Sequence, residues 1–163
     1  MPSMKILLIA GGWSSEREVS LTGARGMQEA LLKRGHAVTF FDLLENFDDL
    51  LETARQHDFA LINLHGSPGE DGLVQAMLEK ADCPYQGSGP SGSFLALNKA
   101  AAKQIFRMAG LPTADWEFLP VRPAEGWGPR LPWPLFVKST TGGSSLRLGR
   151  AANRQELDAL MDE

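Results

Sequence analysis

Short apolar runs alternate with helical patterns along the first part of the chain. Residues 5–10 and 59–64 are predominantly apolar, which is typical of strands buried on both faces of a parallel sheet, and residues 37–41 are predicted to form a further strand. Between them, residues 18–34 repeat apolar positions with helical spacing up to Gly35, and residues 47–55 form a shorter amphipathic pattern. The resulting β-α-β-α-β order predicts an α/β fold with a doubly wound, mainly parallel sheet, whose loops gather at one edge.

The pattern changes after a turn of small residues at 88–92, where we place a domain boundary. Before it we predict a helix at 72–81 and a short strand at 84–87. After it we predict a helix at 93–109 that is recapped at Asn98, strands at 116–119, 134–138 and 146–148, and a capped helix at 153–161. The predicted domains are therefore 1–92 and 93–163. The second has too little apolar surface to close a core, so we expect it to be incomplete.

Composition excludes several classes of function. The 163 residues are 43% hydrophobic and 22% charged, which is ordinary for a soluble globular protein. A net charge of -4 offers no basic surface for nucleic acid, and no apolar stretch is long enough to span a bilayer. The only cysteine, Cys83, excludes an internal disulfide or a cysteine-cluster metal site and favours the reducing cytoplasm.

The segment GGWSSEREVSL at residues 11–21 is the first candidate site. It follows the first buried strand, so its backbone N–H groups and carboxylates are expected at the carboxyl edge of the sheet, where α/β folds bind ligands. An ordinary strand-to-helix turn with a good cap explains the residues equally well. We assign Glu18 and Ser20 to the helix start, through charge near its N-terminus and side-chain capping.

The segment LHGSPGEDG at residues 64–72 follows the third predicted strand. The imidazole of His65 changes charge near neutral pH and, beside backbone donors, suits recognition of a carboxylate. The alternative is a loop histidine bonded to the backbone, followed by two acidic residues that cap the next helix. The other histidines, His36 and His57, are expected to face solvent.

Two lysines form the third candidate site. Lys138 ends a predicted strand directly before the sequence TTGGSS at residues 140–145. Lys99 begins a helical segment and, taken alone, is better explained as an exposed helix residue. Fixed positive charge beside a Gly/Ser turn suits nucleotide phosphates. Neither the Walker pattern nor Gly-x-Gly-x-x-Gly is present, which disfavours P-loop NTPases and Rossmann dinucleotide enzymes.

In their order and spacing these motifs resemble the N-terminal half of D-alanine–D-alanine ligases, which are members of the ATP-grasp superfamily. The resemblance covers nearly the whole chain and is carried by GGWSSEREVSL at 11–21, LHG at 64–66, GEDG at 69–72, PYQGSG at 84–89, NK at 98–99, AGLP at 109–112, VK at 137–138 and GSS at 143–145. It implies a Rossmann-like pre-ATP-grasp, substrate-binding domain at 1–92, followed by an incomplete α+β ATP-grasp subdomain at 93–163.

The resemblance also implies a reaction. ATP would activate the carboxylate of one D-alanine as an acyl phosphate, which the amine of a second D-alanine attacks to give a peptidoglycan precursor for cell-wall biogenesis and cell shape. The implied cofactors are ATP and Mg²⁺, the implied location is the cytoplasm, and the implied assembly is a homodimer.

By position, the resemblance assigns roles to particular residues of this chain. Glu16 would bind the ammonium group of the first D-alanine, with Ser144 closing the active-site loop above it. His65 and Gly66 would lie near the carboxylate of that substrate. The ATP-binding residues would be Lys99, Lys138, Gly143, Ser144 and Ser145.

The sequence departs from the family pattern in the phosphate loop. Ser139 replaces the usual proline, Gly142 a common acidic residue, and Arg147 a usual glycine. The Mg²⁺ ligands, an arginine near the transferred phosphoryl group and the lid belong to the other half of the family's ligases. We therefore expect no metal ligands in these residues and no catalysis by this chain alone. Two alternatives stay open: a non-catalytic module for amino-acid or nucleotide binding or for assembly, and an ATP-grasp ligase that uses a different amine.

Overall fold

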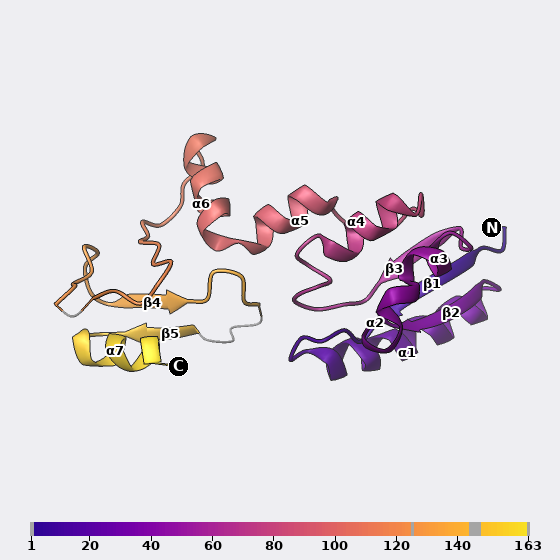
Figure 1. The fold of residues 1–163 in the computed structure, drawn as a ribbon, viewed down its shortest axis with the longest axis horizontal. Coiled ribbons are helices and arrows are strands. Elements are labelled where there is room, and N and C mark those ends of the chain that lie inside the picture. Colours follow the sequence, from indigo (N-terminus) through magenta and orange to yellow (C-terminus); the bar gives the residue numbers. More distant parts are fainter. Residues whose placement is uncertain (1, 125, 144–147, 163) are drawn as a thin grey trace. The chain divides into compact units, whose positions relative to one another are not determined.

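The computed structural model describes residues 2–124, 126–143 and 148–162. It divides into two compact units, Met1–Leu95 and Ala96–Glu163 (Figure 1). The division between the units lies three residues after the boundary drawn from the sequence. The assignment of a substrate-binding domain to 1–92 and of an ATP-grasp subdomain to 93–163 remains a prediction.

The first unit contains a three-stranded parallel sheet. Strand β1 (Lys5–Ala10) lies in the centre, with β2 (Ala37–Asp42) on one side and β3 (Phe59–Ile62) on the other. The strands predicted at 5–10, 37–41 and 59–64 are present. The predicted strand at 84–87 is reduced to one parallel bridge, between Tyr85 and Ala60. The parallel α/β architecture predicted from the apolar runs is therefore confirmed.

Helices cover both faces of this sheet, so the sheet is doubly wound (Figure 1). Alternate residues of β1 point to opposite faces. Leu8 and Ala10 pack against helix α1 (Arg17–Lys33), and Leu7 and Ile9 belong to the core built with α3 (Leu50–Ala54) and α4 (Leu73–Lys80). Within the described residues, no helix has the length and apolar character needed to cross a lipid bilayer.

The single helix predicted at 47–55 is wrong in its extent. The segment consists of α2 (Leu43–Asn46), the 3₁₀ helix η1 (Phe47–Asp49) and α3. Asp42 is the cause of the early start, because its Oδ1 accepts a hydrogen bond from the N–H of Leu44 at 3.1 Å and caps α2 immediately after β2.

The helices around the unit boundary follow the predicted break at Asn98. Helix α5 (Pro90–Leu97) ends there, and α6 (Lys99–Met108) begins with Asn98 Oδ1 accepting from the N–H of Ala101 at 3.0 Å. Helix α5 starts earlier than predicted, within the small-residue turn, because proline is favourable in the first turn of a helix.

In the second unit, β4 (Leu135–Lys138) pairs antiparallel with β5 (Leu148–Ala151), and α7 (Arg154–Asp162) packs on this hairpin. Two buried side chains, Ala151 and Leu157, lie at that contact. The predicted hairpin is confirmed, but its second strand runs from Leu148 to Ala151 and shares only Leu148 with the predicted strand, whose residues 146 and 147 lie outside the described residues.

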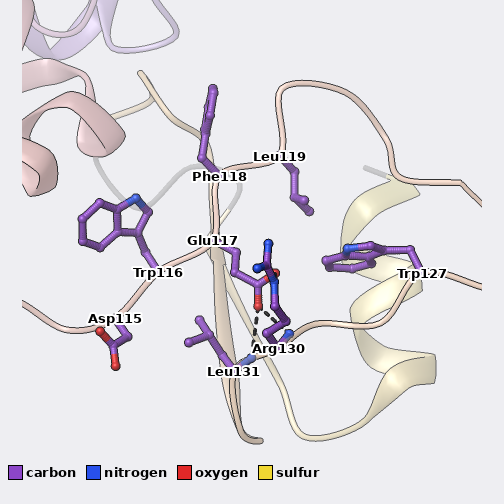
Figure 2. A pocket seen from close by; sticks show the side chains of 8 residues that line it. All are labelled: Asp115, Trp116, Glu117, Phe118, Leu119, Trp127, Arg130 and Leu131. Carbon is purple, nitrogen blue, oxygen red and sulfur yellow. Dashed lines mark hydrogen bonds and ion pairs between the residues drawn. The ribbon is translucent and has the colours of Figure 1, made fainter.

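The strand predicted at 116–119 is wrong, since the structure assigns no strand there. The carboxylate of Glu117 accepts hydrogen bonds from the backbone N–H groups of Arg130, at 2.5 Å, and Leu131, at 3.0 Å. The Glu117 side chain thus accepts the backbone hydrogen bonds that a neighbouring strand would accept in a sheet. Pro132, next in that segment, has no N–H for a ladder. Figure 2 shows this arrangement around a cavity of about 390 Å³.

Candidate ligand site at the carboxyl edge of the parallel sheet

The first unit brings the loops after β1 and β3 together where the strand order β2-β1-β3 reverses. Such topological switch points are where open α/β sheets bind ligands. Ser14 Oγ donates to the backbone carbonyl of His65 at 2.7 Å. A Cβ atom placed on Gly66 would lie 3.3 Å from Ser14 Cβ and 3.7 Å from Glu16 Oε2. Three predicted site residues, Glu16, His65 and Gly66, therefore lie together.

Glu16 occupies the N-cap position of α1. It is half-buried, and its side chain makes no capping hydrogen bond. Its backbone N–H donates to Ser14 Oγ at 3.2 Å, so one hydroxyl group links Glu16 to the loop after β3. A carboxylate at this position can accept charge-assisted hydrogen bonds from an ammonium group, which are among the strongest polar contacts in proteins.

Ser20 does not cap α1, which corrects the sequence interpretation. It lies inside the helix and is fully buried, where its Oγ accepts from the N–H of Gly11 at 2.8 Å and donates to the carbonyl of Asn63. The side-chain amide of Asn63 donates back to the carbonyl of Ser20 at 2.7 Å. Ser20 thereby ties the ends of β1 and β3 to α1, because it lies on the buried face of that helix with Ala24.

An ion pair between Arg17 and Asp42, which the sequence interpretation missed, holds the turn between β1 and α1 against the end of β2. Arg17 contacts Asp42 through Nη1–Oδ1, at 2.7 Å, and Nη2–Oδ2, at 2.6 Å, and Arg17 Nη1 also donates to the carbonyl of Gly12 at 3.3 Å. The hydrogen bond from Arg17 holds the pKa of Asp42 below its ordinary value, against the opposing effect of burial. A lowered pKa means that this pair stabilises the fold fully above the ordinary pKa of aspartate and that the contribution is lost as the pH falls below it.

The loop after β3 is ordered by its own hydrogen bonds. Gly66 donates through its N–H to Glu70 Oε2 at 3.1 Å, and its carbonyl accepts from the N–H groups of Gly69, at 2.9 Å, and Glu70, at 2.8 Å. Asp71 Oδ1 accepts from the N–H of Leu73 at 3.0 Å. Asp71 therefore serves the start of α4, as the alternative for this motif proposed, whereas Glu70 bonds back to the loop and the expectation that it caps this helix is wrong.

The prediction that His36 and His57 face solvent is wrong. His36 Nδ1 accepts from the N–H of Met4 at 3.3 Å, and both ring nitrogens of His57 are hydrogen-bonded, to Thr53 O and Thr39 Oγ1, each at 2.7 Å. Both side chains are half-buried, and they connect the residue before β2 to the residue before β1, and α3 to β2, respectively.

The lysines belong to the second unit and lie around the turn after β4. Lys99 donates through its backbone N–H to Thr140 O at 2.9 Å and through Nζ to Gly142 O at 2.5 Å. Ser139 Oγ accepts from the N–H of Gly142 at 3.1 Å, so the serine that departs from the family pattern orders the turn. Lys138 ends β4 immediately before it.

The chemistry of this turn fits phosphate, because two lysine ammonium groups and a glycine backbone are phosphate donors. Gly143 is described and half-buried, while Ser144, Ser145 and Arg147 lie outside the described residues. In the described part of the chain, no three His, Cys, Asp or Glu side chains gather into a set that could ligate a metal ion.

Comparison with curated proteins finds close relatives over part of their length, although no family model matches the sequence. The D-alanine–D-alanine ligase of Desulfovibrio desulfuricans is 76% identical over 160 residues, which is 98% of this chain and 52% of the relative. The ligase of Nitratidesulfovibrio vulgaris is 66% identical over 154 residues, 94% of this chain and 51% of the relative. The chain therefore spans about half the length of the curated relatives it matches.

Solved structures agree with the sequence comparison. A D-alanine–D-alanine ligase from Bacillus anthracis matches with a TM-score of 0.84 and 34% identity, over 98% of this chain and 53% of that one. A structure of the ligase from that organism complexed with ATP matches with a TM-score of 0.81 and 33% identity, over 98% of this chain and 54% of that one.

Proposed function

We propose that this chain, a relative of D-alanine–D-alanine ligases in sequence and fold, supplies the first-substrate site and part of the ATP site of such a ligase. In the proposed reaction the γ-phosphoryl group of ATP moves to a carboxylate oxygen of D-alanine, and ADP leaves. The amine of a second D-alanine then attacks the acyl carbon, expels inorganic phosphate and forms the dipeptide. The product would be a peptidoglycan precursor made in the cytoplasm.

The observation that carries this proposal is the convergence of Glu16, His65 and Gly66 at the switch point of the sheet. We assign the carboxylate of Glu16 to the substrate ammonium group, because charge-assisted hydrogen bonds are the strongest polar contacts available to an amino acid. His65 is assigned to the substrate carboxylate. Gly66 leaves open the space beside Glu16 Oε2 that a side chain would enter.

We assign Lys99, Lys138 and the backbone of Gly143 to the phosphates of ATP, with Ser144 and Ser145 in the same loop. The contact between Lys99 and Gly142, and the ATP complex of the related ligase, support this assignment. ATP supplies the phosphoryl group, and the two lysines reduce the charge that repels the incoming carboxylate. We propose Mg²⁺ as a cofactor of the whole ligase, with its ligands in the other half of the family's ligases, as the resemblance implies.

Calorimetric titration of Glu16→Gln tests the substrate site. The substitution removes the negative charge and keeps the shape, so we expect D-alanine affinity to fall about 30-fold, equivalent to about 2 kcal/mol for a charged hydrogen bond. ATP affinity should stay within twofold. Glu18→Gln is the matched control, because Glu18 lies exposed two residues further along the same helix.

Three outcomes would separate this proposal from its alternatives. An unmodified chain that gives no heat with D-alanine contradicts the proposed substrate site. Heat with another amino acid, lost in Glu16→Gln, favours a ligase of different amine specificity. Binding of ATP or D-alanine together with catalytic inactivity of the whole protein favours a binding module.

We further propose that these 163 residues do not complete the reaction by themselves, because they correspond to about half the length of the ligases they match. A coupled assay should detect no D-alanine-dependent release of ADP from the chain alone. The full-length relative from Desulfovibrio desulfuricans is the positive control. ADP release by the 163-residue chain, dependent on D-alanine, would refute this expectation.

A further inference from the structure

Two adjacent residues at the start of α1 reach opposite sides of the central strand. Arg17 binds Asp42 at the end of β2, while Glu16 Oε2 lies near Gly66, after β3. Successive residues of a helix point about 100° apart, so one orientation of the first helical turn serves both contacts. Rotation of this turn would move Glu16 and Arg17 together.

Asp42 is well placed to control that orientation. Besides binding Arg17 at two atoms, it pairs with Ala10 in the sheet register and caps α2. Its side chain is only 13% exposed. Arg17 in turn holds the carbonyl of Gly12, so the pair fixes both the helix start and the glycine turn that leads to Glu16.

We propose that Asp42 is a positioning residue for the ammonium site, because it keeps the guanidinium group of Arg17 at β2 and away from Glu16. The inference rests on the proposed role of Glu16 in binding D-alanine. Without the Asp42 carboxylate, an arginine next in sequence to Glu16 would compete with the substrate ammonium for the same carboxylate. Glu18 and Glu45 also attract Arg17, but neither makes the two-point contact that Asp42 makes.

If the released guanidinium group of Arg17 competes with the substrate, the single variant should bind D-alanine more weakly than the double variant. Asp42→Asn keeps the side-chain shape but releases Arg17, so we expect D-alanine affinity to fall about tenfold or more, with ATP affinity within twofold. The double variant R17Q/D42N removes the competing charge, and its D-alanine affinity should recover to within about threefold of the original chain. Raising the salt concentration to 0.5 M should reduce the loss in D42N and leave the double variant unchanged.

A purely structural ion pair would give the opposite order, with the double variant at least as weak as D42N in D-alanine affinity and in melting temperature. That result overturns the proposal. Asp158→Asn is the matched control, since Asp158 pairs with Arg154 at 2.8 Å on α7, outside the proposed site. It should leave D-alanine affinity unchanged.

A measurement without D-alanine keeps the inference separate from the proposed function. The backbone amide NMR signals of Gly12 and Gly66 report on the two ends of the site. In D42N both signals should move, and the Gly66 signal should return toward its original position in R17Q/D42N. Absence of D-alanine binding by the original chain would refute the proposed function alone, whereas a Gly66 signal unmoved in D42N would refute this inference.

Discussion

Gly69→Ala is expected to destabilise the first unit by about 3 kcal/mol, at the upper end of the cost of overpacking a core. A Cβ atom at this position would overlap the Cβ of Leu64 and lie 3.2 Å from the Cα and carbonyl carbon of that residue. Leu64 is 7% exposed and belongs to the main core, so neither its side chain nor its backbone can move aside locally. Urea denaturation followed by circular dichroism measures the loss.

Gly26→Ala is the matched control for this substitution. Gly26 lies inside α1, and nothing lies within 4 Å of the position its Cβ would take. Alanine is favoured over glycine in a helix interior by about 1 kcal/mol, so this variant should gain stability. Equal stability of the two variants would mean that the loop after β3 does not pack on Leu64 as described.

The parallel sheet could be predicted from the sequence because each of its strands is a run of neighbouring residues with a strand-like pattern. Residues 6–10 of β1 and all four residues of β3 are apolar, and such runs are typical of strands buried on both faces of a parallel sheet. The segment around Trp116 also has a local strand pattern, yet it forms no strand. This segment forms no strand because Glu117 accepts hydrogen bonds from the N–H groups of Arg130 and Leu131. Such a contact between distant residues cannot be predicted from the pattern of neighbouring residues.

The candidate site could also be predicted only in part. The positions of Glu16, His65 and Gly66 follow from topology, because the carboxyl ends of parallel strands share one edge. The ion pair of Arg17 with Asp42 joins residues 25 apart, so periodicity does not reveal it. Ser20 could have been recognised from its i, i+4 spacing to Ala24, which places it on the buried face of α1.

Gly11→Ala should combine a loss of stability with a loss of the proposed site. Gly11 has a φ of +78°, where an L-residue costs about 1–2 kcal/mol. Its Cβ would also lie 2.5 Å from Asp42 Oδ1 and closer still to Arg17 Nη1. We expect a total loss of about 3 kcal/mol, since the ion pair must open to admit the methyl group.

Gly35→Ala separates the two contributions, because Gly35 has a nearly equal φ of +84° but no atom within 4 Å of the Cβ position. This variant should lose about 1 kcal/mol from backbone conformation alone and keep its D-alanine affinity. The remaining difference between the two variants measures the cost of opening the Arg17–Asp42 pair. If Gly11→Ala lost stability but kept D-alanine affinity, the pair would support the fold without positioning Glu16.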